Sequence, residues 1–203
     1  MVCGTLIAGM SKTWTKHVHA RLLNSRLALA GWLRKLSRRV GKTMWLTDQT
    51  FRTVVAAAPL VSIDLLVENV KGEVLLGQRL NRPASGFWFV PGGRIQKNET
   101  LDLAFQRLTL FELGRTFERS QAKLLGVYEH FYTDCVFGDS EGDPDTHYVV
   151  LCYHLRLPDD IVLSPPTGQH EYYRWWVKED MQSSEEVHPN SRVYADRVAF
   201  SFS

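Results

Sequence analysis

The stretch that decides the fold is GGRIQKNETLDLAFQRLTLFELG, residues 92–114. Its apolar residues recur at helical intervals, at Leu101, Ala104, Phe105, Leu108 and Phe111. This spacing is typical of a helix with one apolar face. Two glycines precede the pattern, and Gly114 follows it at the place where a glycine commonly ends a helix. The segment therefore predicts a helix between two glycine turns.

The sequence on both sides of this helix predicts strands. Runs of branched apolar residues indicate a strand at 60–68 and a hairpin partner at 73–79, joined by a turn at 69–72. Further elements are expected as strands at 87–91, 123–132, 147–157 and 171–176 and as a final helix at about 190–200. One helix among hairpin-connected strands favours an α+β sandwich over a doubly wound sheet.

The charges divide the chain into two parts. The 203 residues include 24 basic and 22 acidic ones, which give a net charge of +2. Nine of the basic residues lie in the first 47 positions, which hold no acid, so the remainder carries 15 basic against 22 acidic residues. We therefore expect a basic extension at 1–43, one domain at 44–203, and no nucleic-acid partner for that domain.

Three interpretations of the extension remain open. It is an amphipathic targeting segment, a membrane-surface helix, or an upstream read-through ahead of a true start at Met44, and we favour the last. Its longest apolar run, LALAGWL, is too short to span a bilayer, so no membrane partner is expected. The three cysteines lack CxxC spacing, which indicates neither a disulfide framework nor a zinc cluster and favours a reducing, cytoplasmic setting.

Residues 93–114 resemble the Nudix box, G-x5-E-x7-R-E-U-x-E-E-x-G-U, in which U is a bulky aliphatic residue. The matching positions are Gly93, Glu99, Arg107, Glu112 and Gly114. Leu108 and Phe111 replace two of the box carboxylates, which would share one helix face with Glu112. A single carboxylate cannot fill the six oxygen positions of Mg²⁺, so we expect one ion, held with the help of other oxygen donors and substrate phosphates. Arg107 is expected to pair with a box carboxylate such as Glu99; direct contact with phosphate is the alternative.

From about Met44 onward, the chain resembles the GDP-mannose mannosyl hydrolase family, an atypical Nudix branch with this shortened box. The resemblance rests on the runs PLVSIDLLVEN, GQRLNRPASGFWFVPGGRIQKNETL, AFQRLTLFELG, HFY, THYVVL, QHEYYRW and VHPNSRVY. It implies a Nudix fold, a mixed β-sheet sandwich with a loop–helix–loop box, and a homodimer. It also implies Mg²⁺-dependent hydrolysis of GDP-mannose, and of GDP-glucose, to GDP and free sugar. Water would attack the anomeric carbon with inversion.

The resemblance also implies the residues of the site. One Mg²⁺ per subunit would bind the Gly92 carbonyl, the Glu112 carboxylate and the Gln169 side chain. His170 matches the general base, and a neutral imidazole suits that role because its ordinary pKa is about 6.5.

The remaining matches concern the substrate. Arg79 and Arg94 match arginines that bind the diphosphate of the leaving group, and Tyr148 matches a tyrosine that donates to it. Asp64 and His130 match orienting residues near the sugar. Guanine contacts are expected from the segment that contains Trp45, Leu46 and Phe51.

Two other functions stay open from the sequence. The first is a nucleoside-diphosphate-sugar pyrophosphatase, in which water attacks phosphorus and GMP is released. The second is a non-catalytic Nudix module that binds a nucleotide sugar. The loop at 134–145 is longer than the family resemblance would lead us to expect, which leaves the choice among mannose, glucose and fucose undecided.

Overall fold

The computed structural model describes residues 46–138, 141–165 and 170–199, with the side chains of His170, Glu171, Val198 and Ala199 left aside. These residues belong to a compact unit that runs from Leu46 to Ser203. The expected extension at 1–43, together with Trp45 and Gln169, lies outside the described residues.

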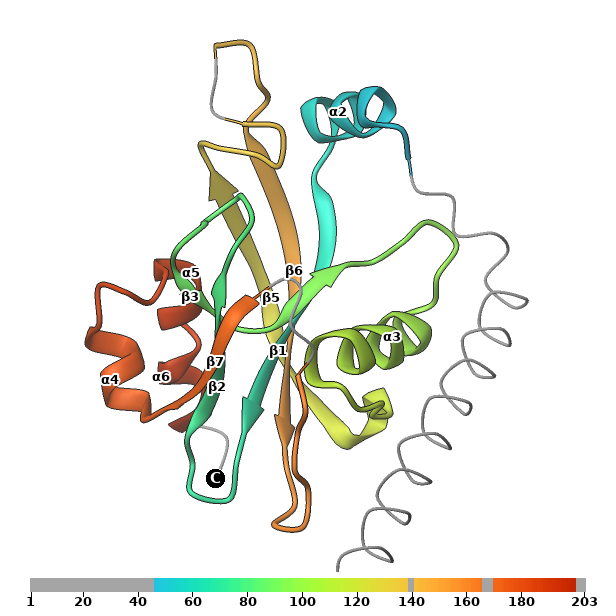
Figure 1. The fold of residues 1–203 in the computed structure, drawn as a ribbon. Coiled ribbons are helices and arrows are strands. Elements are labelled where there is room, and N and C mark those ends of the chain that lie inside the picture. Colours follow the sequence, from blue (N-terminus) through green and yellow to red (C-terminus); the bar gives the residue numbers. More distant parts are fainter. Residues whose placement is uncertain (1–45, 139–140, 166–169, 200–203) are drawn as a thin grey trace, which may run out of the picture. The chain divides into compact units, whose positions relative to one another are not determined.

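The longest strands of the domain lie side by side (Figure 1). β1 (Leu60–Glu68) pairs in parallel with β6 (Thr146–Arg156) along its whole length, from Leu60 opposite Tyr148 to Glu68 opposite Arg156. On its other side, β6 pairs antiparallel with β5 (Ala122–Tyr132). The sheet is therefore mixed, as the resemblance implied, although the sequence pattern alone gave no sign of the parallel pair.

The predicted hairpin exists only at its turn. β1 and β2 (Val74–Arg79) pair at Glu68 opposite Val74, after which β2 diverges. β2 then pairs with β3 (Trp88–Phe89) and with β7 (His170–Trp176). The divergence leaves the other end of β1 available to a different strand.

That strand is β4 (Gly92–Arg94), where the sequence predicted only a glycine turn. It pairs antiparallel with β1, so that Gly92 lies opposite Asp64. A Cβ on Gly92 would lie 2.4 Å from the carbonyl oxygen of Ile63, so no other residue fits this close approach. The glycine pair thus brings the start of the box against the middle of the sheet.

The predicted helix is confirmed as α3 (Leu101–Leu113). The Thr100 hydroxyl caps its first turn by accepting a hydrogen bond from the Leu103 backbone. Gly114 ends it with φ of 72°, a left-handed conformation that favours glycine. A Cβ on Gly114 would also lie 2.0 Å from the Ser164 carbonyl oxygen, because the segment that leads toward β7 passes against this helix end.

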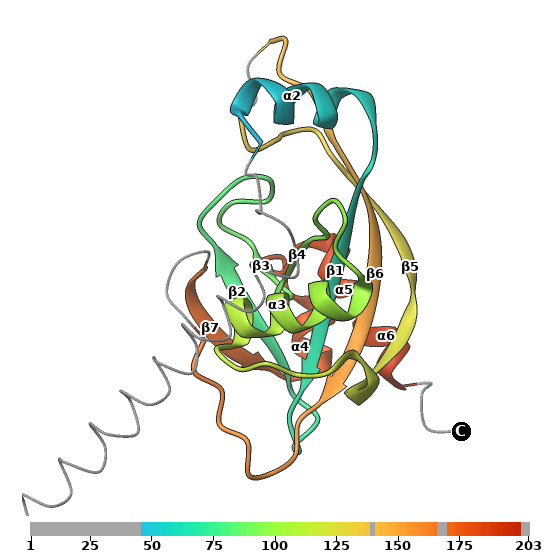
Figure 2. The same ribbon diagram turned by 90° about the vertical axis from the view of Figure 1, so that its right-hand side faces the viewer.

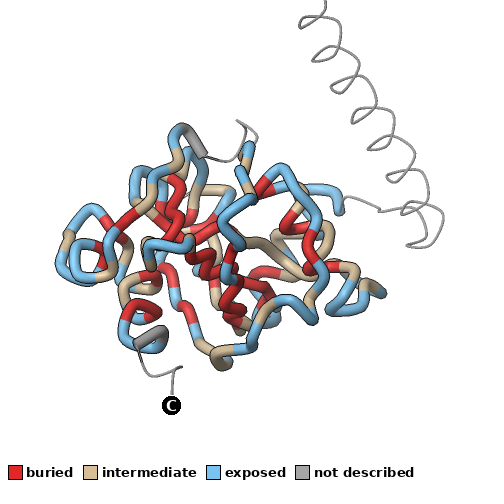
Figure 3. Tube along the Cα trace, turned by 90° about the horizontal axis from the view of Figure 1, so that it is seen from below, coloured by how far each residue is buried: buried red, intermediate tan, exposed pale blue. Residues whose placement is uncertain are grey.

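Helices cover both faces of the sheet (Figures 1 and 2). α3 packs on the face formed by Ile63, Leu65 and Val67. The opposite face, which includes Leu66, meets Met181 and Tyr194 from the C-terminal helices. Because side chains alternate along a strand, Asp64 shares the face of Leu66. Buried positions run through the strands between these layers (Figure 3).

The predicted final helix at about 190–200 is divided into α5 (Pro189–Arg192) and α6 (Ala195–Ala199). A further helix, α4 (Lys178–Ser183), precedes them and was not predicted. His188 caps α5 by accepting a hydrogen bond at Nδ1 from the Asn190 backbone, at 3.2 Å. Tyr194 therefore lies in the turn between α5 and α6, fully buried against the sheet.

Two smaller elements complete the domain. The 3-10 turn η1 (Arg119–Gln121) precedes β5. The helix α2 (Asp48–Ala57), which the sequence analysis did not predict, begins at the Thr47 cap. Its Phe51, Val54 and Val55 side chains pack with Cys135 and Phe137 of the 134–145 loop. Of the segment expected to bind guanine, Phe51 therefore lies on a helix that packs against that loop.

Candidate functional site

One cavity of about 660 Å³ gathers most of the residues that the sequence indicated. They are Asp64, Arg79, Gly92, Arg94, His130 and Tyr148. Residues from β1, β2, β4, β5 and β6 meet there because β4 and β6 both pair with β1 near Asp64. Val136, from the loop at 134–145, also lines the cavity. That loop is thus part of the wall.

Two arginines line the cavity. Arg79 lies over the Phe89 ring. Burial raises the pKa of Asp64 and of Tyr148, and the Arg79 charge opposes both shifts. Burial lowers the pKa of His188, and the Arg79 charge adds to that shift. Arg94 is partly buried, and this burial lowers the pKa of its guanidinium group. Two fixed guanidinium groups at one cavity suit a ligand with two neighbouring phosphates.

A buried hydrogen-bonded chain also reaches the cavity, because Asp64 and His130 both line it. The Tyr194 hydroxyl donates to Asp64 Oδ2 at 2.8 Å, and the hydroxyl oxygen of Tyr194 lies 3.1 Å from His130 Nε2. All three side chains are almost entirely buried. Tyr194 was missed by the sequence analysis, because nothing in the VHPNSRVY run signals which strand its side chain meets.

Burial changes the proton affinities of this chain. It raises the pKa of the Asp64 carboxyl to about 7, although the Tyr194 hydrogen bond and the Arg79 charge oppose the shift. It lowers the pKa of His130 to about 4, with a further lowering from His188. At neutral pH, His130 is therefore a neutral imidazole, and Asp64 is close to half-ionised.

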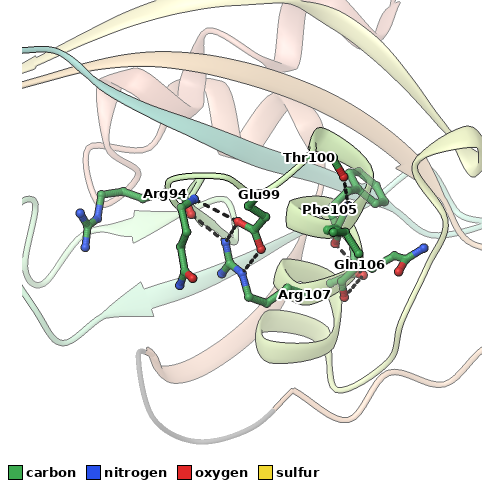
Figure 4. Close-up of polar contacts among 9 residues, drawn as sticks. Arg94, Glu99, Thr100, Phe105, Gln106 and Arg107 are labelled. Atoms are coloured by element: carbon green, nitrogen blue, oxygen red, sulfur yellow. Dashed lines mark hydrogen bonds and ion pairs between the residues drawn. The ribbon is translucent and has the colours of Figure 1, made fainter. Parts of the chain in front are cut away.

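The box is held together by a buried ion pair (Figure 4). Arg107 Nε donates to Glu99 Oε1 at 2.6 Å, and Arg107 Nη2 donates to Glu99 Oε2 at 2.7 Å. The same Nη2 donates to the Arg94 carbonyl oxygen at 2.8 Å. Arg107 thus has the structural role that the sequence indicated, and it ties α3 to the strand that carries Arg94.

Of the expected metal donors, Gly92 immediately precedes the box and Glu112 lies on its helix. Gly92 lines the cavity, whereas Glu112 is buried on α3, one helical turn after Leu108. A Cβ on Gly93 would lie 2.8 Å from Leu108 Cδ2, so this face of α3 is turned toward β4. Burial raises the pKa of Tyr173, and the negative charge of Glu112 raises it further. Glu112 is therefore close enough to β7 to act on it electrostatically.

Gly92 and Glu112 carry the kinds of oxygen donor that Mg²⁺ prefers, a carbonyl and a carboxylate. The charge of Glu112 acts on Tyr173 of β7, and Gln169 lies outside the described residues. Among the described residues, no cluster of three His, Cys, Asp or Glu side chains can hold a metal by itself. A metal here would accordingly need backbone, amide and ligand oxygens.

Of the remaining expected residues, the structure describes the backbone of His170 and the whole of Leu46 and Phe51. The backbone of His170 begins β7 and lies opposite Arg79, which places it beside a cavity-lining position. Leu46 is exposed. One face of the Phe51 ring is covered by Arg94, whose guanidinium carbon lies 4.0 Å from the ring centroid.

Comparison with known proteins identifies the family. The model of the NUDIX domain matches residues 58–197. The chain therefore belongs to the Nudix family, whose hydrolases generally use divalent metal ions. The low-salt glycan biosynthesis protein Agl8 of Haloferax volcanii is 42% identical over 118 residues, which make up 58% of this chain and 72% of that protein.

Solved structures share the fold at low identity. The MutT Nudix hydrolase of Burkholderia pseudomallei has a TM-score of 0.55 and 24% identity, over 70% of this chain and 98% of that one. The Nudix domain of Shewanella oneidensis NrtR, solved with ADP-ribose, has a TM-score of 0.54 and 17% identity, over 76% and 97%. These likenesses establish the Nudix fold. Within the described residues, no helix is long and apolar enough to cross a bilayer.

Proposed function

We propose that this Nudix protein is a Mg²⁺-dependent hydrolase that cleaves GDP-mannose, and GDP-glucose, to GDP and free sugar. The observation that carries the proposal is a cavity lined both by two arginines and by Asp64 and His130 of a buried Asp64–Tyr194–His130 chain. The arginines suit a diphosphate, and the chain suits the hydroxyls of a sugar. The single box carboxylate on α3 supports one metal ion rather than the several that a carboxylate-rich box would hold.

In the proposed mechanism, Arg79 and Arg94 bind the diphosphate and stabilise the charge that grows on the leaving GDP. Tyr148 adds a hydrogen bond to the same group, and burial keeps its hydroxyl protonated by raising its pKa. Gly92, Glu112 and Gln169 would hold Mg²⁺, which supplies further positive charge to the diphosphate when bound.

The base in this mechanism is His170, which removes a proton from the water that attacks the anomeric carbon. Its position opposite Arg79 in the sheet supports this role, because Arg79 lines the cavity. Asp64 and His130 orient the sugar. Attack from the face opposite the leaving GDP would invert the configuration.

The proposal also covers the cellular compartment, the oligomeric state and the contacts to guanine and sugar. Cys135 and Cys152 are buried free thiols, which supports a reducing, cytoplasmic compartment. We also propose that the protein assembles as a homodimer and that the α2 region contacts guanine. The choice of sugar is assigned to the cavity wall that includes Val136.

The proposal is tested by hydrolysing GDP-mannose in ¹⁸O-labelled water with Mg²⁺ present. We expect the label on the sugar, GDP as the nucleotide product, and inverted configuration of the first-formed anomer by NMR. A label on phosphate with release of GMP would instead show a pyrophosphatase. Binding without turnover across a panel of GDP- and ADP-sugars would show a non-catalytic module.

A further inference from the structure

Tyr194 occupies a position that the proposed mechanism does not require, which makes its contacts informative. It comes from the turn between α5 and α6, is fully buried, and does not line the cavity in the described residues. Its hydroxyl nevertheless touches two side chains that do line the cavity, Asp64 at 2.8 Å and His130 at 3.1 Å.

When Asp64 is ionised, the number of hydrogens fixes the direction of this chain of hydrogen bonds. A phenol has one hydrogen, and Tyr194 gives it to the Asp64 carboxylate. The Tyr194 oxygen can then only accept a hydrogen bond from His130, so Nε2 of that imidazole must carry a hydrogen. Because burial keeps His130 neutral, the second ring nitrogen, Nδ1, carries none and is an acceptor.

We propose that Tyr194 is a positioning residue that links Asp64 to His130 and holds the His130 imidazole in its Nε2–H tautomer. Because Asp64 and His130 both line the cavity, the chain offers it two acceptors, an Asp64 carboxylate oxygen and His130 Nδ1. Such a pair selects a ligand with neighbouring hydroxyl donors. This last step rests on the proposed function, whereas the tautomer does not.

The packing around Tyr194 suits a positioning role. The Tyr128 ring lies edge-on against the Tyr194 ring, with centroids 4.9 Å apart, and fixes its direction. The phenol spans from the C-terminal turn to β1 and β5, so the helices behind the sheet set the geometry of the sugar side. Phenylalanine at 194 would keep the packing and remove the link.

Tyr128 provides a matched control. It lies in the same packed group, and its hydroxyl makes a hydrogen bond with Arg197 rather than with the Asp64–His130 pair. Tyr128→Phe removes one phenol hydroxyl from the same part of the core. Tyr128 is partly buried, so comparison with Tyr194→Phe separates loss of the link from loss of a neighbouring phenol hydroxyl.

The direct test is ¹⁵N NMR of the histidine side chains in the full chain without ligand, with the His130 signals assigned by a His130→Asn variant. We expect the wild type to show neutral His130 with hydrogen on Nε2. Tyr194→Phe should move these signals toward a mixture of tautomers, and Tyr128→Phe should leave them unchanged. Hydrogen on Nδ1 in the wild type would overturn the inference, even if Tyr194→Phe did not fold.

The functional test measures kcat and KM with GDP-mannose, together with the Kd of GDP. Tyr194→Phe should lower kcat by about 10- to 100-fold, as expected when a reacting group is misplaced, and should leave GDP binding within about twofold. Unchanged kcat would refute the positioning role but leave the proposed function intact. Absence of turnover in the wild type would refute the proposed function, and the NMR result would still decide the tautomer.

Discussion

The Arg94 guanidinium carbon lies 4.0 Å from the centroid of the Phe51 ring, which connects α2 directly to the cationic side of the cavity. The sequence suggested that Phe51 would offer a stacking face to guanine. In the structure, one ring face is used by Arg94, and the ring packs at 5.6 Å against Phe137. α2 therefore helps to orient an arginine that the proposed mechanism assigns to the diphosphate.

Phe51→Leu should weaken binding of Mg²⁺–GDP by about 2- to 30-fold, the range expected from loss of a cation–π contact of about 0.5–2 kcal/mol. Isothermal titration calorimetry measures this. Phe137→Leu is the control, because Phe137 packs on Phe51 but its ring contacts Arg52 rather than Arg94. Equal losses in both variants would mean that packing, and not the Arg94 contact, matters.

The Glu99–Arg107 pair should be a large contributor to stability. Only 1% of the Glu99 side chain and 12% of the Arg107 side chain is exposed, so Glu99→Gln leaves a buried cation without its partner. We expect a loss of about 3–5 kcal/mol in the free energy of unfolding, measured with urea. The exposed Asp102–Arg119 pair is the control, and Asp102→Asn should cost about 1 kcal/mol or less. Similar losses at both sites would contradict this difference.

Gly114→Ala should destabilise the domain through two effects. Alanine is strained at φ of 72°, and its Cβ would meet the Ser164 carbonyl oxygen. We expect a loss of more than about 1 kcal/mol. Gly142→Ala is the control, because Gly142 has φ of 91° but open space around its Cβ position. If the two variants lost equal stability, the close approach of Ser164 would contribute nothing.

The histidine that caps α5 should make stability depend on pH. Burial lowers the pKa of His188 to about 4, with further lowering from Arg79 and Arg192, whereas the unfolded value is about 6.5. Between these values the unfolded chain binds more protons, so stability is lost as the pH falls from about 6.5 toward 4. Protonation would also remove the acceptor that caps the helix.

His188→Asn keeps a capping acceptor that does not titrate. Between pH 7 and pH 5, the melting temperature should fall less in the variant than in the wild type. We expect the difference to be a few degrees, which corresponds to about 1 kcal/mol of stability linked to the protonation of His188. Asp64 also titrates across this range, but it remains in the variant and cancels in the comparison. His130 remains as well but loses the lowering of its pKa that comes from His188, so the measured difference includes the coupling of these two histidines. Parallel melting curves would show that His188 does not contribute.

His170→Gln tests the proposed base. It should lower kcat by about 10²- to 10⁴-fold, because a glutamine cannot accept the proton from water. The Kd of GDP should stay close to the wild-type value, since the proposed phosphate contacts come from Arg79 and Arg94. Single-turnover kinetics with GDP-mannose provide the measurement, and an unchanged rate would mean that another group is the base.

Local patterns predicted most elements well. α3, β1, β2, β5 and β7 lie within one or two residues of their expected bounds, because apolar periodicity and glycine stops are properties of adjacent residues. α2 was missed, although the Thr47 cap and the spacing of Phe51, Val54 and Val55 could have indicated it. The division of the last helix depends on the His188 cap and the turn at Tyr194, which periodicity does not reveal.

Local sequence patterns could not predict contacts between segments that lie far apart in the chain. The parallel pairing of β1 with β6 and the pairing of Gly92 with Asp64 are tertiary relationships, and only family resemblance suggested where the site residues meet. The same reason hid Tyr194, whose partners lie on β1 and β5. The Glu99–Arg107 pair was predictable because both residues belong to one loop and the helix that follows it.

The full-length parallel ladder between β1 and β6 also bears on how a newly made chain becomes active. The ribosome completes the glycine-flanked box long before it has made β6, and parallel strands far apart in sequence pair slowly because a long loop must close first. Tyr194 emerges later still. A nascent chain can thus contain the box while it still lacks a cavity wall, so it becomes able to bind ligand only after β6 and Tyr194 have been made.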